Sequence, residues 1–260
     1  MRTLKITLAY DGTNYAGWQR QHTAPTIQAL VEDALSEVEG SSVKLYGAGR
    51  TDAGVHALGQ VASVCLSHSI DSMALLRAVN SKLPNDVRVI DVQQVADTFH
   101  ARFDTSGKYY RYRLGIGRVQ NPLEQRFLWW LSEPIKLSPM REASAVLCGQ
   151  HDFASFQTAT DDSSPTSTVR TITAITIGVE EDQNWNALGG NREARIITVD
   201  IHGNGFLRHM VRTIVGTLVE IGRDRRTPES MAKLLSSRDR SQAGPTAPAR
   251  GLFLVSVEYP

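Results

Sequence analysis

The chain has 260 residues, of which 41% are hydrophobic and 21% charged. This composition supplies enough apolar material for a globular core, and it excludes a disordered, collagen-like or fibrous protein. The N-terminal residues lack the continuous apolar run of a secretory leader, and nowhere do about 18 apolar residues follow one another. We therefore expect a protein that is neither secreted nor membrane-spanning.

The cysteines and the basic residues indicate the cellular location of the protein and the kind of partner it binds. Cys65 and Cys148 are far apart and have no partner at metal-ligand spacing, which predicts reduced thiols, a cytoplasmic location and no metal site. The formal net charge is only +1, but 22 arginines stand against 6 lysines, and arginine is the side chain that forks onto phosphate and stacks on bases. Positive charge is concentrated in residues 102–126 and 204–226. This distribution suits a protein that presents one face to a polyanion, although a GC-rich genome and separate solvated faces would give a similar pattern.

The first hundred residues alternate between strand and helix patterns. Apolar residues at period two predict a strand over 4–10, and helical spacing after Pro25 predicts a helix that stops at Gly40. Further elements follow in chain order: strands at 43–46 and 60–66, a helix at 72–83 capped by Asp71, and a strand at 87–95. The order is the strand–helix–strand–strand–helix–strand arrangement of ferredoxin-like domains.

The second half of the chain repeats this alternation of strands and helices less regularly. Its predicted elements are a strand at 109–116, a helix from Ser138 to Gly149, strands at 152–156, 168–177 and 194–201, helices at 206–221 and from Pro228, and a last strand at 252–259. The polar stretches 158–168 and 180–193 have loop composition. We therefore predict an α+β protein in which two tandem ferredoxin-like halves, residues 1–103 and 104–260, form a mixed, mainly antiparallel sheet with a central cleft.

The densest cluster of chemistry-bearing residues is Gly47-Ala48-Gly49-Arg50-Thr51-Asp52-Ala53-Gly54-Val55-His56, between two predicted strands. Its glycines permit tight turns and close approach of a partner, but the segment lacks both the dinucleotide-binding and the P-loop patterns. Metal binding or glycosidase chemistry would need further carboxylates near Asp52. The aspartate therefore fits a nucleophile or a lone base held ionised by an arginine, while a simple hairpin loop remains the alternative.

Two other segments combine basic side chains with aromatic or glycine residues. Residues 108–113, Lys-Tyr-Tyr-Arg-Tyr-Arg, place Tyr110 and Tyr112 on one strand face and Arg111 on the other, a pattern suited to RNA bases and phosphates or to an ordinary half-buried strand. Residues 203–212 lead from glycines into a helix that would carry Arg208 and Arg212 one turn apart. Arg208 could equally be a solvated surface residue. Arg212 lies among apolar residues, so we expect it to be half-buried and to need an anionic partner.

Taken together these segments resemble the tRNA pseudouridine synthase A family. The resemblance rests on Tyr10-Asp11-Gly12-Thr13, Gly17-Trp18-Gln19, the string 47–56, Tyr110-Arg111-Tyr112, Gly205-Phe206-Leu207 with Met210-Val211-Arg212, and the tail 247–252. It extends in order over nearly the whole chain, and the central string is its most specific part. The stretch 180–193 is longer than the family pattern leads us to expect.

The resemblance implies a function and a set of site residues. It implies isomerisation of uridine to pseudouridine at positions 38, 39 and 40 of the tRNA anticodon arm by a homodimer, with no cofactor and no metal. Asp52 matches the nucleophile, Arg212 the arginine paired with it, Tyr110 the tyrosine that stacks on the target uracil, and Arg50 the residue implicated in displacing the base. Further residues are expected among those that contact substrate or RNA: Gln19, Arg20, Thr51, His56, Arg111 and Arg208.

Two rival interpretations remain open at the level of sequence. Ferredoxin-like halves with aromatic-basic strands also build RNA-binding modules without catalytic activity. A metal-dependent phosphoesterase centred on Asp52 is a weaker alternative, because clustered partner carboxylates are missing.

Overall fold

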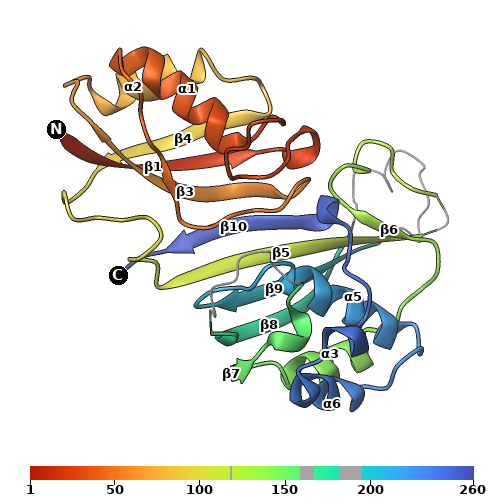
Figure 1. Cartoon of the computed structure of the whole chain (residues 1–260). Coiled ribbons are helices and arrows are strands. Elements are labelled where there is room, and N and C mark those ends of the chain that lie inside the picture. The colour runs from red at the N-terminus through yellow and green to blue at the C-terminus, as the bar shows by residue number, and fades with distance from the viewer. Residues whose placement is uncertain (118, 159–166, 182–194) are drawn as a thin grey trace. The chain divides into compact units, whose positions relative to one another are not determined.

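A computed structural model describes residues 1–117, 119–158, 167–181 and 195–260. These residues form two compact units, shown with their elements in Figure 1. Unit 1 comprises Met1–Lys108 together with Phe253–Pro260, and unit 2 comprises Tyr109–Leu252. Unit 1 thus contains residues from both predicted domains. The parts of the predicted loops at 159–166 and 182–194 lie outside the described residues.

Unit 1 is an α+β unit. Its elements are β1 (Arg2–Tyr10), α1 (Ile27–Glu39), β2 (Tyr46–Gly47), β3 (His56–Leu66), α2 (Ser72–Asn80), β4 (Val87–Gln94) and β10 (Leu252–Glu258). The strand order is β4-β1-β3-β10, and β2 pairs with β3. The β1–β3, β1–β4 and β2–β3 pairs are antiparallel, whereas β10 runs parallel to β3. The chain order of the first six elements is the predicted one.

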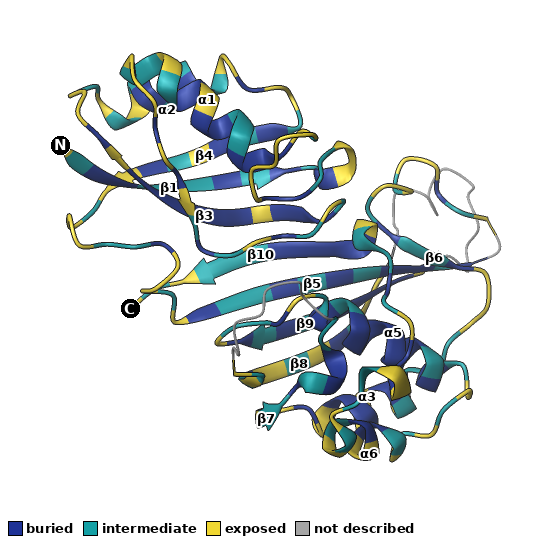
Figure 2. Cartoon of the chain, viewed as in Figure 1, coloured by how far each residue is buried: buried dark blue, intermediate teal, exposed yellow. Residues whose placement is uncertain are grey.

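The core of unit 1 lies between its sheet and its two helices. Leu4, Ile6 and Leu8 on β1 are at most 1% exposed, as the period-two pattern predicts, and the buried residues of α1 include Val31 and Leu35. Figure 2 shows buried residues along both elements. Gly40 ends α1 with φ 76°, the left-handed conformation that glycine adopts without a steric penalty. Asp71 caps α2 as predicted, since its carboxylate accepts hydrogen bonds from two backbone N–H groups.

Unit 2 is also α+β. Its elements are β5 (Gly107–Ile116, which begins at the end of unit 1), β6 (Trp129–Leu131), α3 (Leu137–Ala145), β7 (Gly149–Asp152), β8 (Val169–Glu181), β9 (Arg195–Gly203), α5 (Met210–Gly222) and α6 (Ser230–Ser237). The strand order is β5-β9-β8-β7, and β6 pairs in parallel with β5. The β7–β8 and β8–β9 pairs are antiparallel. The predicted class, α+β with mixed and mainly antiparallel pairing, is confirmed, while the two ferredoxin-like halves stay a prediction.

Two of the predicted strands are largely absent, and one predicted helix begins later than expected. The strand predicted at 43–46 is reduced to β2, because the N–H groups of Val43 and Leu45 donate to the Ser36 hydroxyl and the Glu32 carboxylate instead of to a neighbouring strand. Residues 154–156 form a short 3-10 turn, in which Phe153 and Phe156 are both buried at a spacing of three. The helix predicted from residue 206 begins only at Met210, because His209 is left-handed with φ 61°. The short strand β6 was not predicted.

Candidate active site

The glycine-rich string forms the connection between β2 and β3, and its ends are fixed by hydrogen bonds within unit 1. The backbone N–H of Ala48 donates to the Val61 carbonyl at 2.8 Å, and the side-chain amide of Gln60 donates to the Gly49 carbonyl at 3.0 Å. The ammonium group of Lys108 donates to the Ala48 carbonyl at 2.9 Å. These bonds hold the first part of the loop against β3 and the start of β5.

Thr51 anchors the middle of the loop. Its side chain is 6% exposed, and its hydroxyl lies 2.8 Å from the hydroxyl of Tyr10. Burial raises the pKa of Tyr10 to about 12, although hydrogen bonding opposes the shift. The Thr51 carbonyl also accepts a hydrogen bond from the backbone N–H of Trp18 at 3.0 Å. The residue before Asp52 is therefore fixed through both its side chain and its backbone.

Asp52 is half-buried, at the start of a tight turn. Its carbonyl accepts a hydrogen bond from the Val55 N–H at 3.1 Å, and Gly54 within the turn has φ 77°. Arg50, two residues earlier, is exposed. The loop thus places a carboxylate next to a fixed backbone and an exposed guanidinium on the same short segment.

A second segment, residues 11–18, packs directly against this loop. A methyl group at Gly12 would collide with the carbonyl of Val55, and one at Gly17 would lie 2.6 Å from the Thr51 carbonyl oxygen. Trp18 is 2% exposed, and its ring leaves no room for a side chain at Gly47. These glycines are needed for close approach, which explains why the two glycine-containing motifs occur together.

His56 closes the loop from inside the core. Its side chain is 1% exposed, its ring stacks on Phe253 at 4.8 Å, and its Nδ1 accepts a hydrogen bond from the Gly12 N–H at 3.0 Å. The same nitrogen lies 3.1 Å from a carboxylate oxygen of Asp11, so a protonated ring would exchange the Gly12 bond for an ion pair. The burial of Thr51 and His56 favours a part in holding the loop, and RNA contact by either stays a prediction.

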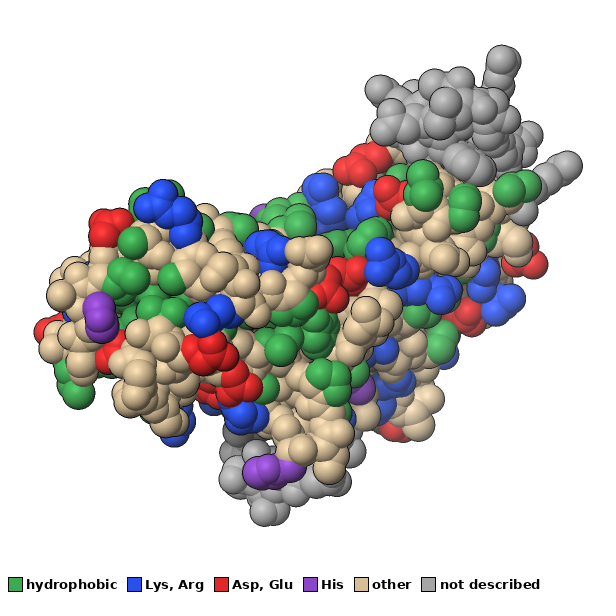
Figure 3. Space-filling model, turned by 90° about the horizontal axis from the view of Figure 1, so that it is seen from above, with side chains coloured by type: hydrophobic (Ala, Val, Ile, Leu, Met, Phe, Trp, Pro, Cys, Tyr) green, Lys and Arg blue, Asp and Glu red, His purple; other side chains and the backbone are tan. Residues whose placement is uncertain are grey.

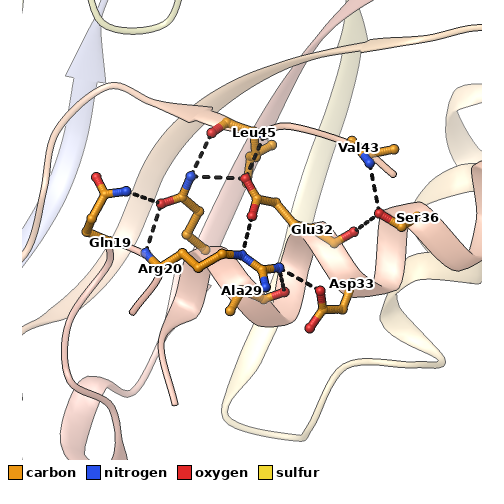
Figure 4. Close-up of polar contacts among 9 residues, drawn as sticks. Gln19, Arg20, Ala29, Glu32, Asp33, Ser36, Val43 and Leu45 are labelled. Atoms are coloured by element: carbon orange, nitrogen blue, oxygen red, sulfur yellow. Dashed lines mark hydrogen bonds and ion pairs between the residues drawn. The ribbon is translucent and has the colours of Figure 1, made fainter. Parts of the chain in front are cut away.

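Gln19 and Arg20 lie in a polar network at the start of α1 (Figure 4). Nε of Arg20 donates to the buried Glu32 carboxylate at 2.7 Å, and its terminal nitrogen donates to Asp33 at 2.6 Å. These carboxylates raise the pKa of the guanidinium. The Gln19 amide donates to Gln28 at 3.0 Å. Both predicted RNA contacts are therefore engaged with α1, although the Arg20 side chain remains 45% exposed.

In unit 2, the alternation predicted for β5 is observed. Tyr110 and Tyr112 are 8% and 0% exposed, whereas Arg111 is half-buried on the other face. The Tyr110 ring makes an edge contact with Phe206 at 5.1 Å. Arg111 donates to both oxygens of Asp200, at 2.8 and 3.0 Å, and this pairing raises the pKa of the guanidinium.

The two arginines near α5 differ in environment. Arg212 lies in the first turn of α5 and is half-buried, as expected, and its Nε donates to the Ala247 carbonyl at 2.8 Å. Arg208 is exposed and precedes the helix, so the expectation that both arginines lie one turn apart on a helix is wrong. The left-handed His209 between them is the physical reason.

Three further predictions concern the charged surface, metal binding and membrane spanning. On the face shown in Figure 3, lysine and arginine side chains lie in several places, with acidic and apolar side chains between them. Among the described residues, no group of histidine, cysteine and carboxylate side chains could hold a metal ion. No described helix is long and apolar enough to cross a membrane.

Sequence reasoning missed three residues that position the loop. Gln60 and Lys108 hold its first carbonyls, and Glu32 connects Arg20 with the segment that enters the loop. A glutamine inside the apolar strand pattern at 56–66 was the available signal for Gln60. The pattern around Glu32 is that of an ordinary amphipathic helix, so the sequence contains no signal that marks this residue.

The structure is an α+β protein, and comparison with known proteins identifies its family. A family model described as tRNA pseudouridine synthase matches residues 6–104 and 143–260. The chain is 44% identical over 261 residues to the tRNA pseudouridine synthase A of Moorella thermoacetica, 42% over 259 to that of Geobacter sulfurreducens, and 40% over 259 to that of Thermoanaerobacter sp. (strain X514). Each of these matches covers 100% of both chains.

The chain therefore belongs to the tRNA pseudouridine synthase family. It is an isomerase that acts on uridine in tRNA. This assignment confirms the resemblance found in the sequence.

Proposed function

We propose that this protein isomerises uridines 38, 39 and 40 of the tRNA anticodon stem-loop, with Asp52 as the nucleophile. One observation carries the proposal: the backbone on both sides of Asp52 is fixed by hydrogen bonds within unit 1, while its side chain stays half-buried. A nucleophile needs such a fixed position, because misplacement by about 1 Å can cost roughly a hundredfold in rate.

Three other residues take roles in the same reaction. Tyr110 stacks on the target uracil, and its edge contact with Phe206 keeps the ring in one orientation. Arg212 matches the arginine that the family pairs with its nucleophile, and its half-buried guanidinium is the cation proposed to act together with Asp52. Arg50 is exposed, as a residue that displaces a base from its stack must be before RNA binds. RNA contacts by Gln19, Arg20, Thr51, His56, Arg111 and Arg208 belong to the same proposal.

The reaction proceeds on a uridine that has been flipped out of the RNA. Asp52 attacks either the anomeric carbon of the ribose or C6 of the uracil, and the glycosidic bond between C1′ and N1 breaks. The detached uracil rotates and forms a new bond from C5 to C1′. Loss of the C5 proton and release of Asp52 complete the isomerisation. Exclusion of water protects the detached base and the activated sugar from side reactions.

The reaction as written balances without a redox partner, so no cofactor is required by this mechanism. We propose that the enzyme works as a homodimer in the cytoplasm, where it would meet its tRNA substrates. A solution mass of twice 28.6 kDa in light scattering would support the dimer, and a mass of 28.6 kDa would contradict it.

Tritium release from the target base tests the catalytic proposal. A tRNA transcript labelled at C5 of uracil must release the label to water when the new bond forms at C5. Transcripts that keep a uridine at only one of positions 38, 39 and 40 then establish which sites react. Release from a uridine elsewhere in the tRNA, with none from these three, would contradict the proposed position.

The matched variants are Asp52→Asn and Asp97→Asn. The first removes the proposed nucleophile at nearly constant size, and we expect it to abolish tritium release while tRNA binding remains. The second neutralises an exposed aspartate elsewhere in unit 1 and should leave release unchanged. Full release by Asp52→Asn would remove the nucleophile assignment.

A further inference from the structure

Unit 1 carries a row of three aromatic rings outside the proposed catalytic residues. The rings of Tyr46 and His100 have centroids 5.2 Å apart, and those of His100 and Phe103 are 4.3 Å apart. We call these three residues the aromatic row.

The aromatic row is unusually exposed for residues of this type. Phe103 is 75% exposed and Tyr46 is 42% exposed, whereas His100 is half-buried between them. Single exposed apolar residues are common, but adjoining exposed rings form a patch that marks an interaction site. The flat rings offer the kind of surface on which unstacked nucleobases pack.

Cations flank the aromatic row at both ends. Nζ of Lys44 lies 5.2 Å from the centre of the Tyr46 ring, and the guanidinium carbon of Arg102 lies 5.9 Å from the centre of the Phe103 ring. Both side chains are exposed. The carboxylate of Asp104, two residues after Arg102, accepts a hydrogen bond from the His100 backbone N–H. Rings with a cation at either end match a strand of bases with its phosphates.

The aromatic row is attached to the base of the loop that carries Asp52. Tyr46 directly precedes Gly47 and pairs with Ser63 on β3. The Ser63 hydroxyl accepts a hydrogen bond from the N–H of Ala101, the residue between His100 and Arg102, at 3.1 Å. Ala101 also packs with Ala48 of the loop in one buried cluster. The aromatic row and the loop therefore share one rigid support.

We propose that the aromatic row, with Lys44 and Arg102, is a stacking platform for unpaired bases of the tRNA next to the modified nucleotide. This platform rests on the proposed function, because it lies beside the modified nucleotide only if the loop that carries Asp52 is the catalytic one. RNA is favoured over a protein occupant because a cation lies beside the ring at each end of the row, and cations alongside aromatic rings are characteristic of sites for single-stranded RNA.

Binding of an unmodified tRNA transcript tests the platform. Phe103→Ala should weaken binding about tenfold at fixed salt, since a base–aromatic stack contributes that order of affinity. Phe103→Leu keeps apolar bulk without a flat ring and should behave like the alanine variant, while Phe103→Trp should restore binding. Met73→Ala, at another exposed apolar residue of unit 1, is the control and should bind normally. Normal binding by Phe103→Ala, or full binding by Phe103→Leu, would overturn the proposal.

Two further measurements distinguish the flanking cations and the alternative occupant. Lys44→Gln and Arg102→Gln should each lower the salt dependence of tRNA binding by about one released counterion, whereas Phe103→Ala should leave it unchanged. The solution mass of Phe103→Ala, measured without RNA, should equal that of the unaltered protein. A lower mass would show that the aromatic row contacts a second copy of the chain, and would overturn the RNA assignment.

The platform and the catalytic proposal can fail separately. Binding is measured in the Asp52→Asn background, where chemistry is absent, so the platform is judged without turnover. In the active enzyme, Phe103→Ala should raise KM for tRNA and leave kcat nearly unchanged. A fall in kcat at constant KM would contradict a platform outside the catalytic centre, whereas tritium release by Asp52→Asn would contradict only the nucleophile.

Discussion

Glu32 and Arg20 form an ion pair at 2.7 Å in which the carboxylate is buried and the guanidinium is partly exposed. The other carboxylate oxygen accepts hydrogen bonds from the Gln28 amide at 3.0 Å and from the Leu45 backbone N–H at 2.9 Å. One side chain of α1 thus fixes both the segment that follows Trp18 and the segment that enters the Asp52 loop.

Replacing Glu32 with alanine should therefore destabilise the protein by about 3 kcal/mol, because each buried donor left unpaired costs about 1–3 kcal/mol. Glu32→Gln retains an acceptor for Leu45 and should lose less. Asp33→Asn removes the negative charge of the exposed partner of the same arginine and should change stability by less than about 1 kcal/mol. Urea unfolding midpoints provide the comparison. Equal losses for Glu32→Ala and Asp33→Asn would show that the buried carboxylate has no special part.

Tyr10→Phe should produce a pH-dependent loss of stability. At pH 7 the variant lacks the hydrogen bond to Thr51 and should be less stable by about 1 kcal/mol. The pKa of Tyr10 is raised from 10.0 to about 12, so the stability linked to its proton is complete below pH 10 and is lost as the pH rises toward 12. Because phenylalanine has no such proton, the gap between the two proteins should narrow from pH 7 to pH 11. A gap that stays constant in urea unfolding at both values would contradict this account.

Gly12→Ala should impair both folding and activity. Its new methyl group would collide with the Val55 carbonyl in the turn that follows Asp52, so either the loop or the 11–18 segment must move. Gly40→Ala is the matched control, because its methyl group meets nothing within 4 Å but is strained by φ 76°. The control should cost about 1–2 kcal/mol in stability and leave turnover of folded enzyme intact. If both variants retained full tritium release, close packing at Gly12 would have no effect on the loop.

Tyr110→Phe should separate the ring of this tyrosine from its hydroxyl. The aromatic surface and the edge contact with Phe206 are preserved, so the ring should still be able to stack on a base. A large fall in single-turnover rate would assign a chemical role to the hydroxyl, and an unchanged rate would assign the contribution to stacking alone. Tyr110→Ala, which lacks both groups, should be slow in either case, and normal turnover by that variant would remove Tyr110 from the proposal.

The periodic signals of the sequence predicted most elements of the fold, because they reflect local burial. Period two in β1 and helical spacing in α1 correspond to residues that are nearly fully buried. The errors arose where side chains satisfy backbone groups: Glu32 and Ser36 divert the N–H groups expected in a longer β2, and left-handed His209 shortens α5. No periodic pattern reports such contacts.

The site was predictable to a different extent. The string 47–56 predicted a loop between two strands, and the structure has this loop between β2 and β3. Together with the other motifs it also pointed to the family that the comparisons show. The supports of the loop were harder to find, because Gln60, Lys108 and Glu32 are distant in sequence and each resembles an ordinary strand or helix residue. The aromatic row was not predicted either, since Tyr46 and Phe103 are brought together by the pairing of β2 with β3 and by the packing of Ala101.

The strand β10 has a consequence for biosynthesis. Phe253 stacks on His56, which lies at the end of the Asp52 loop. The ribosome makes Phe253 almost two hundred residues after His56. A ribosome that adds about 5–20 residues per second reaches this phenylalanine on the order of 10–40 s after the histidine. Throughout that interval the nascent loop lacks the ring that supports it, so the packing around His56 is completed only after residue 253 has been made.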